Sequence, residues 1–251
     1  MPDSPKQPEG AYPPVHPSAH PPQQGPGLLA SLRQVPIVSL WLLLSLLAFP
    51  LSLQVTGDLP VFAPEILTAM FMLDAIPAPG ATGEHLLRLL YDGQVWRLVS
   101  PVFLHFGFLH IAFNSVLFFI LGVGLEKRLG GWLLLVCLLV WAGVSNVAQL
   151  LHSGSPFFGG LSGVVTAMFG ARLVLSYLRP ADPLMYLPRP LVISVFVSLF
   201  LFSTGVAALM DVNIANTAHW SGLAIGIVTG ALLDLVLPPV RRLEQPPGRQ
   251  L

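Results

Sequence analysis

The stretch Phe157-Phe158-Gly159-Gly160-Leu161-Ser162-Gly163 stands at the head of an apolar run. Further along, Ala218-His219-Trp220-Ser221-Gly222 stands at the head of another. A hydroxyl and an imidazole that each open a membrane-length segment form an unusual pair. They indicate a nucleophile and a base that meet just below one face of a bilayer. This interpretation requires that the surrounding runs can span a membrane.

The composition is that of a membrane protein. The chain has 251 residues, of which 54% are hydrophobic and only 10% are charged, and its mean hydropathy is +0.74. A soluble domain carries about 25% charged residues, so this chain could not cover a water-facing surface. Its formal net charge of zero gives no reason to expect a nucleic-acid partner. The single cysteine, Cys137, lies inside an apolar run and is interpreted as a small core residue.

A membrane-spanning helix needs roughly 20 mainly apolar residues. Six runs meet that length, which predicts an all-α membrane protein built as a six-transmembrane-helix bundle. The runs lie at about Pro36 to Val55, Gly107 to Leu125, Trp132 to Leu151, Phe158 to Leu178, Leu191 to Met210 and Ala218 to Leu237.

The segment between the first two runs, about Gly57 to Phe106, is a long loop. It contains an amphipathic stretch, Pro60 to Leu73, and the pair Trp96-Arg97. Apolar connecting segments of this kind lie in the membrane interface, and a Trp beside an Arg is a common interface anchor. The loop is therefore predicted to be interfacial.

The chain divides into a Pro-rich tail over residues 1–32, a membrane domain over residues 33–238 and a short polar tail over residues 239–251. The first tail is predicted to be disordered because its composition cannot form a core, and it lacks the pattern of a signal peptide. With the N-terminus inside, ten of the 12 Lys and Arg residues lie in cytoplasmic segments or span ends, and only Arg88 and Arg97 lie outside. This asymmetry predicts a multi-pass protein of the cell (inner) membrane with both termini cytoplasmic.

Four polar residues share one depth in this topology: His110, Asn114, Ser162 and His219. The runs that hold them all cross from outside to inside, and each residue lies in the first turns of its run. Helix N-termini also direct free N–H groups and a positive dipole to that depth. Such an arrangement stabilises a developing oxyanion.

Ser162 and His219 each have a purely structural interpretation as well. Serine is common in membrane helices, where it bonds to backbone or to a neighbouring helix, and a histidine can make an interhelical hydrogen bond. Ionisable residues within spans are costly, however, and are usually functional. The glycines beside Ser162 provide the close backbone approach that a nucleophile needs.

Two small-residue stripes offer a way to bring Ser162 and His219 together. Span six carries Gly222, Gly226 and Gly230, and span four carries Gly163, Ala167 and Ala171. Two such faces let helix backbones approach closely, which could place the imidazole within hydrogen-bond reach of the hydroxyl. The alternative is plain helix packing, and both interpretations can hold together.

No metal or cofactor is predicted. His105, His110 and Asn114 lie near one depth but lack the acidic and cysteine partners expected of a metal site. His110 and Asn114, one helical turn apart, fit better as donors to an oxyanion. Asp211 is not favoured as a third catalytic residue, so a Ser–His dyad is the simplest interpretation. The sequence Glu126-Lys127-Arg128 is either a solvated turn or a structural ion pair.

These residues resemble one family, the rhomboid intramembrane serine proteases. The resemblance covers about Gln94 to Leu237, the greater part of the chain. It rests on motifs whose order and spacing agree with the family: Trp96-Arg97, His105-Phe-Gly-Phe-Leu-His110-Ile-Ala-Phe-Asn114, Glu126-Lys-Arg128, Gly160-Leu-Ser162-Gly163, and Ala218-His219 followed by Gly222 and Gly226.

The resemblance implies a rhomboid-like bundle with a water-filled cavity that opens outward. It implies Ser162 as nucleophile and His219 as base and later acid, with His110, Asn114 and the Ser162 backbone N–H as the oxyanion hole. The remaining motif residues look like the family's structural elements. The implied partners are membrane proteins within the lipid bilayer, cut near the start of a transmembrane helix and usually after a small residue.

Two positions depart from the family pattern. Thr166 stands where many members carry a Tyr that stacks on the catalytic histidine, and Thr217 stands where many have Gly. Neither change removes a reacting group. A rhomboid-like pseudoprotease, which binds membrane clients without cutting them, is the competing class, although such proteins typically lack the serine or the histidine. A transporter or channel would explain intramembrane His and Gly but not their pairing with Ser162. The sequence specifies no oligomeric state.

Overall fold

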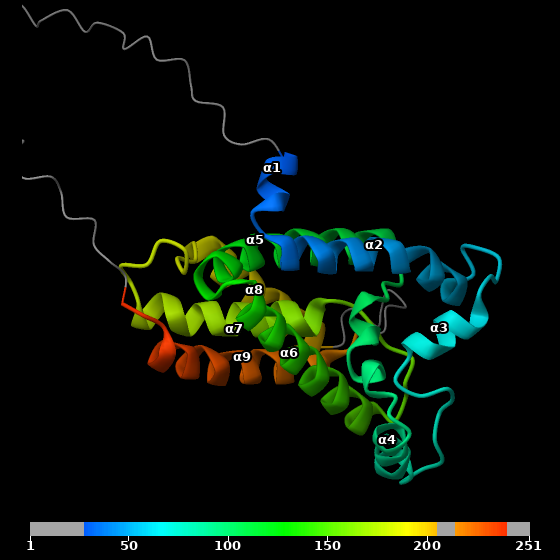
Figure 1. Cartoon of the computed structure of the whole chain (residues 1–251). Coiled ribbons are helices and arrows are strands. Elements are labelled where there is room, and N and C mark those ends of the chain that lie inside the picture. The colour runs from blue at the N-terminus through cyan, green and yellow to red at the C-terminus, as the bar shows by residue number, and fades with distance from the viewer. Residues whose placement is uncertain (1–27, 205–213, 240–251) are drawn as a thin grey trace, which may run out of the picture.

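The computed structural model describes residues 28–204 and 214–239, and within these ranges all regular structure is helical (Figure 1). Six longer helices build the bundle, and short helices connect the first two of them. The bounds are α1 (Leu28–Arg33), α2 (Pro36–Thr56), α3 (Pro64–Met70), α4 (Thr82–Tyr91), the 3₁₀ turns η1 (Val95–Leu98) and η2 (Ser100–Phe103), α5 (Phe108–Leu129), α6 (Gly131–Ser153), α7 (Ser162–Leu178), α8 (Arg189–Ser203) and α9 (Asn216–Val236).

Four of these helices, α2, α5, α6 and α9, are long and apolar enough to cross a membrane, and α7 and α8 are shorter apolar helices. An apolar all-helical bundle is therefore present, while the count of six spans stays a prediction. The fourth predicted run began at Phe158, but α7 begins at Ser162 because the preceding Gly160 has a φ of +115° and cannot be helical. The fifth run was expected to reach Met210, which lies outside the described residues.

The helix α7 forms the centre of the bundle. Every residue from Gly163 to Ala171 is buried, and α7 contacts α5, α6 and α9. A helix surrounded in this way needs an apolar residue on every side. From Gly163 to Ala171 the α7 sequence meets that need except at Thr166, whose hydroxyl bonds to the Gly163 carbonyl oxygen, and the first residue of the helix is Ser162. The central position of α7 therefore places the serine hydroxyl inside the bundle.

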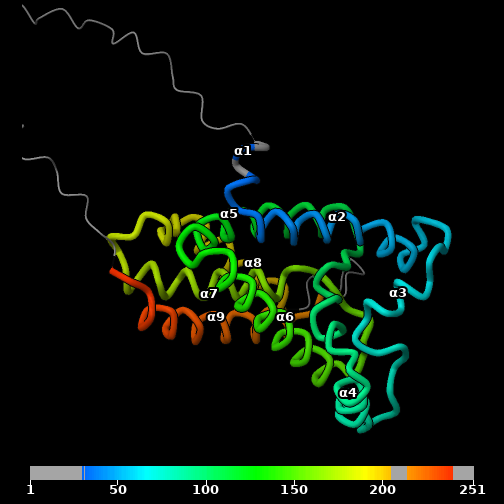
Figure 2. The backbone as a smooth tube through the Cα atoms, viewed as in Figure 1, coloured from blue at the N-terminus to red at the C-terminus, as the bar shows by residue number. Residues whose placement is uncertain are grey.

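The helices α7 and α9 lie side by side along most of their length (Figures 1 and 2). A Cβ added to Gly222 would lie 2.1 Å from the Gly163 carbonyl oxygen, and one added to Gly226 would lie 2.0 Å from the Ala167 carbonyl oxygen. A Cβ added to Gly230 would lie 2.7 Å from the Ala171 carbonyl oxygen. The two small-residue stripes thus face each other in direct backbone contact, as the spacing predicts.

The segment between α2 and α5 is fastened by Arg97 and Trp96. The Arg97 guanidinium donates hydrogen bonds to the carbonyl oxygens of Thr68 (3.2 Å) and Phe71 (3.1 Å) and pairs with Asp74 at 2.7 Å. The Trp96 ring N–H donates to the Ala69 carbonyl oxygen at 3.2 Å. These two residues therefore hold the connecting segment together, and its position at a membrane interface stays a prediction.

Glu126 is a structural residue and its carboxylate is not in a solvated turn. It is only 4% exposed, and its two oxygens accept hydrogen bonds from the backbone N–H groups of Ile37 and Val38, both at 2.9 Å. These N–H groups lie in the first turn of α2, where they have no partner within the helix. A carboxylate there also meets the positive end of the helix dipole. Glu126 of α5 thus caps α2.

The tail assigned to residues 1–32 differs from the structure at its end. Residues Leu28–Arg33 form the short helix α1, which is consistent with the apolar composition of Leu28, Leu29, Ala30 and Leu32. The rest of that tail, and most of the tail assigned to residues 239–251, lies outside the described residues.

We expect Gly226→Ala to destabilise the protein by about 1–3 kcal/mol or more, because its new methyl group overlaps a backbone carbonyl that cannot rotate away. Gly143→Ala on α6 is the matched control, since nothing lies within 4 Å of a Cβ at that position. Alanine favours a helix over glycine, so the control should unfold at or above the wild-type temperature. Thermal unfolding of both variants in one detergent tests this. Equal unfolding temperatures would contradict the close contact of α7 and α9.

Candidate active site

Ser162 and His219 are joined by a hydrogen bond. The distance between the Ser162 Oγ and the His219 Nε2 is 2.8 Å, and the two residues come from the first turns of α7 and α9. His219 is buried and Ser162 is half-buried. The structure thus brings together the two residues that the sequence singles out first.

The glycine-rich loop before Ser162 packs closely against the segment before α5. The Gly160 N–H donates to the Pro101 carbonyl oxygen at 3.1 Å. A Cβ on Gly159 would lie 2.8 Å from that same oxygen, and one on Gly160 would lie 2.7 Å from the His110 Nε2. Neither position has room for a side chain, and the positive φ of Gly160 also favours glycine. The two glycines therefore let the loop pass close to His110.

His105 binds the backbone of this loop next to Ser162. Its Nε2 accepts a hydrogen bond from the Leu161 N–H at 3.2 Å, so its Nδ1 carries the proton and donates to the Phe103 carbonyl oxygen at 3.1 Å. The backbone N–H of His105 donates to the Ser52 Oγ of α2 at 2.9 Å. Burial lowers the pKa of His105 to about 3, so the imidazole is neutral at physiological pH. His105 thus links α2 to Leu161, the residue before the serine.

His110 and Asn114 lie one turn apart on α5, on the side that faces the glycine-rich loop. The Cβ position of Gly160 is 2.7 Å from the His110 Nε2 and 3.8 Å from the Asn114 Nδ2. The rings of His105 and His110 also lie close, with centroids 4.9 Å apart. Donor groups from α5 therefore gather beside the loop that leads to Ser162, which is where an oxyanion hole is predicted.

The start of α9 is held by Gln149 of α6, a residue that sequence reasoning missed. Its side-chain Oε1 accepts a hydrogen bond from the Ala218 N–H at 3.1 Å, and both groups are buried. This bond caps one of the free N–H groups in the first turn of α9. A glutamine within an otherwise apolar run was the available signal, because polar groups inside a membrane domain need partners.

The two residues that depart from the family pattern, Thr166 and Thr217, take part in local hydrogen bonds within their own helices. The Thr166 hydroxyl donates to the Gly163 carbonyl oxygen at 2.9 Å, and the Thr217 carbonyl oxygen accepts from the Ser221 hydroxyl at 2.6 Å. An aromatic ring does lie near His219, but it comes from Phe202 of α8, with centroids 6.3 Å apart and a tilted geometry. Within the described part of the chain, the buried Nδ1 of His219 has no hydrogen-bond partner.

Two further expectations concern acidic residues and metals. Asp211, which was weighed as a third catalytic residue, lies outside the described residues. In the ranges that the structure describes, no group of three or more His, Cys, Asp or Glu side chains is placed to hold a metal ion. The polar groups that meet at the site are thus a hydroxyl, imidazoles and amides.

A hydrogen-bonded Ser–His pair at the N-termini of two apolar helices is the kind of site found in hydrolases with a serine nucleophile, here inside a bundle of apolar helices. The family model for the rhomboid domain matches residues 92–234. This match covers more than half of the chain and includes every motif residue discussed above. The protein belongs to the rhomboid family.

Curated relatives agree with this assignment. The chain is 46% identical over 135 residues to the rhomboid protease GlpG of Serratia proteamaculans, an alignment that covers 54% of this chain and 47% of that protein. It is 45% identical over 135 residues to the rhomboid protease GlpG of Yersinia pestis, with the same coverage. The chain spans about half the length of the curated relatives that it matches.

We expect His105 to make folding sensitive to acid. Its pKa is about 3 in the folded protein against 6.5 for a free imidazole, so below about pH 6.5 the unfolded chain binds a proton that the folded protein excludes. Stability should therefore be constant above that pH and fall as the pH drops toward about 3. A His105→Gln variant, which keeps one acceptor and one donor, should show a smaller loss. Thermal unfolding at about pH 8 and about pH 5 measures the difference, and parallel losses in both proteins would refute it.

Proposed function

We propose that the protein is an intramembrane serine endopeptidase in which Ser162 is the nucleophile and His219 is the general base. The observation that carries the proposal is the 2.8 Å hydrogen bond between the Ser162 Oγ and the His219 Nε2. Membership of the rhomboid family and similarity to proteins named rhomboid proteases support it. No cofactor is required by this chemistry.

The proposed reaction follows from the two atoms in contact. The neutral imidazole of His219 accepts the hydroxyl proton at Nε2 while the Ser162 Oγ attacks the carbonyl carbon of the scissile peptide bond. The imidazolium then gives the proton to the leaving amine, and an acyl-enzyme forms. A water molecule then loses a proton to Nε2 as it attacks the acyl carbon. The bond between that carbon and the Ser162 Oγ breaks, the imidazolium returns the proton to Oγ, and the carboxylic acid product leaves. A dyad suffices for this cycle, and no third residue is invoked.

The developing oxyanion needs donors that are already in place. We assign this role to the side chains of Asn114 and His110 together with the backbone N–H of Ser162. Ser162 is the first residue of α7, so its N–H has no acceptor within the helix, and it lies at the positive end of the helix dipole. The two α5 side chains lie beside the adjacent Gly160 backbone. Together they would surround an oxygen bound next to Ser162.

The proposed substrates are membrane proteins whose spanning helix is weak near the outer face. A peptide bond inside a stable helix is shielded by the hydrogen bonds of that helix. The segment must unwind to reach Ser162, which Gly, Pro or polar residues make easier. A small residue at the cut site fits a loop in which the Gly159 and Gly160 positions have no room for a Cβ.

We further propose that the site opens toward the outer face of the cell membrane and that both termini are cytoplasmic. The contacts of the bundle support this topology. The first turns of α7 and α9 meet at Ser162, and the last turns of the same helices meet at Arg179 and Asp234, so the two helices run in the same direction. The ion pairs of Arg128 and Arg179 lie at the end of the bundle opposite to the proposed site, and an excess of Arg and Lys is expected on the cytoplasmic side.

Replacing either residue of the dyad should abolish cleavage of a single-span model substrate in detergent or liposomes. The two residues act as a unit, so the Ser162→Ala, His219→Ala and double variants should retain similar residual rates. A fluorophosphonate probe should label the wild-type protein at Ser162 and should fail to label Ser162→Ala. Wild-type cleavage by the serine variant would rule out this nucleophile. Expression and thermal unfolding of each variant provide the control for folding.

Asn114→Ala should lower turnover with little change in substrate affinity. Its amide is assigned to a charge that exists only in the transition state, and the loss of one such donor costs about 2.7–4 kcal/mol in a soluble protease. His110→Ala should have a smaller effect, because backbone N–H groups share the load. Values of kcat and KM for the model substrate separate the two possibilities. A defect of Asn114→Ala confined to KM would contradict the oxyanion role.

A further inference from the structure

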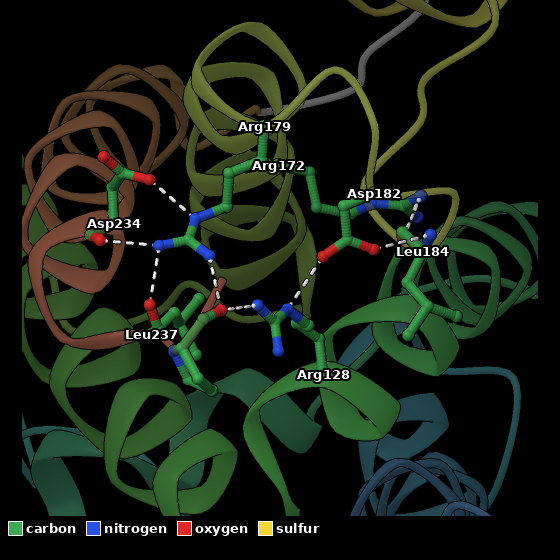
Figure 3. Close-up of polar contacts among 8 residues, drawn as sticks. Arg128, Arg172, Arg179, Asp182, Leu184, Asp234 and Leu237 are labelled. Carbon is green, nitrogen blue, oxygen red and sulfur yellow. Dashed lines mark hydrogen bonds and ion pairs between the residues drawn. The ribbon is translucent and has the colours of Figure 1, made fainter. Parts of the chain in front are cut away.

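The end of α9 farthest from Ser162 is held by one arginine. Arg179, the residue after the last turn of α7, donates from Nε to the Asp234 carboxylate at 2.6 Å. Its terminal nitrogens donate to the backbone carbonyl oxygens of Asp234 (2.7 Å), Leu237 (2.8 Å) and Pro238 (2.8 Å). Figure 3 shows this guanidinium between α7 and the end of α9. One side chain thus satisfies carbonyl groups that the helix end leaves without partners.

A second arginine holds the same point from the other side. Arg128 of α5 also donates to the Pro238 carbonyl oxygen, and it pairs with Asp182 of the α7–α8 connection at 2.7 Å. The Arg128 and Arg179 side chains are 14% and 13% exposed, so both pairs are largely shielded from solvent. The end of α9 is therefore fixed against both α5 and α7 (Figure 3).

The small-residue stripes cannot by themselves fix how far α9 slides along α7. They pair position 163 with 222, 167 with 226, and 171 with 230, so the pattern repeats every four residues. A shift of α9 by four residues, about 6 Å, would place a small residue of one helix against a small residue of the other again. The repeating face thus permits close contact at more than one axial position.

The Arg179 contacts occur once and do not repeat. Arg179 donates to the carbonyl oxygen of Pro238. The two residue numbers differ by the same amount as in each stripe pair, so this contact belongs to the same alignment of α9 on α7. A shifted α9 would lose the Asp234 carboxylate and all three carbonyl acceptors together. The guanidinium is suited to this task because its planar fork presents five N–H donors in fixed directions, whereas a lysine ammonium is a single point of charge.

We propose that Arg179 is a positioning residue that fixes the axial register of α9 on α7 and thereby holds His219 opposite Ser162. The inference rests on the proposed function and names the part of the fold on which the dyad geometry depends. The two ends are separated by 17 residues of α7, about 25 Å. Arg179 acts through α9 as a rigid element and does not touch the reacting atoms.

The first test is Arg179→Lys, compared with Arg189→Lys, which changes an exposed arginine at the start of α8. We expect kcat for a single-span model substrate to fall by about tenfold to a hundredfold in Arg179→Lys, because a displacement of about 1 Å at the reacting atoms has an effect of this size. KM should stay within about twofold, and Arg189→Lys should behave as wild type. Rates are measured on monodisperse protein well below its unfolding temperature. A lowered unfolding temperature with wild-type kcat would show a purely structural role and would overturn the proposal.

Asp234→Ala provides a second variant if Arg179→Lys does not fold. It removes the acceptor of the Arg179 Nε and leaves the three carbonyl bonds, so we expect a smaller loss of kcat, about twofold to fivefold, again without a change in KM. A folded Asp234→Ala protein with wild-type kcat would then overturn the proposal.

A distance measurement tests the register without using activity. Tyr177 of α7 and Ala224 of α9 are both exposed, and each is replaced by a cysteine that carries a spin label. The distance between the two labels reports the axial position of one helix on the other. On a Cys137→Ser background we expect one narrow distance in the parent protein and a shifted or broadened distribution with Arg179→Lys. An unchanged distribution would reject the register role. If the parent protein neither cleaves the model substrate nor reacts with a fluorophosphonate probe, the proposed function fails, and the distance result still decides the register.

Discussion

The contact on which the rest of the structure depends is the meeting of two helix backbones at Gly226 and the Ala167 carbonyl oxygen. In a membrane the surrounding lipid is as apolar as the helix surface, so helices associate through close packing and hydrogen bonds and gain little from leaving the solvent. One face of α9 carries glycines, which have no side chain, and α9 therefore approaches α7 more closely than any other residue type at these positions would permit. That approach brings an imidazole on one helix to a hydroxyl on the other. The candidate site is therefore a by-product of how the two helices pack.

Such packing leaves polar groups at the helix ends that water cannot reach freely, and the protein satisfies them from neighbouring elements. Gln149 of α6 caps the first turn of α9, Glu126 of α5 caps the first turn of α2, and His105 binds the residue that precedes α7. Each of these bonds joins segments far apart in the sequence. All three contacts hold the bundle together, and those of Gln149 and His105 also position the segments that carry His219 and Ser162.

Much of this arrangement could be predicted from the sequence, and the part that could not is informative. The pairing of Ser162 with His219 follows from two polar residues at the heads of apolar runs, and the α7–α9 contact follows from stripes of small residues every four positions. The start of α7 could not be predicted from hydropathy. Phe157 and Phe158 are as apolar as the residues of a membrane helix, but the positive φ of Gly160 keeps this segment out of α7. The roles of Gln149 and Arg179 were also not predictable. Apart from the Asp234 carboxylate, their partners are backbone groups, which every residue carries, so only the folded chain shows which of them lie within reach.

In the proposed topology, the length of α7 sets how deep the serine lies in the membrane. Its 17 residues rise about 25 Å, whereas the hydrocarbon layer of a typical bilayer is about 30 Å thick. With Arg179 at the polar boundary on one side, the other end of the helix stops about 5 Å short of the opposite boundary. Ser162 would then lie below the level of the headgroups, where a polar group of another protein arrives only with its own water or by local thinning of the lipid. Under the proposed function, the fixed length of α7 means that a thicker or thinner membrane would change how far a substrate segment must enter the membrane to reach Ser162.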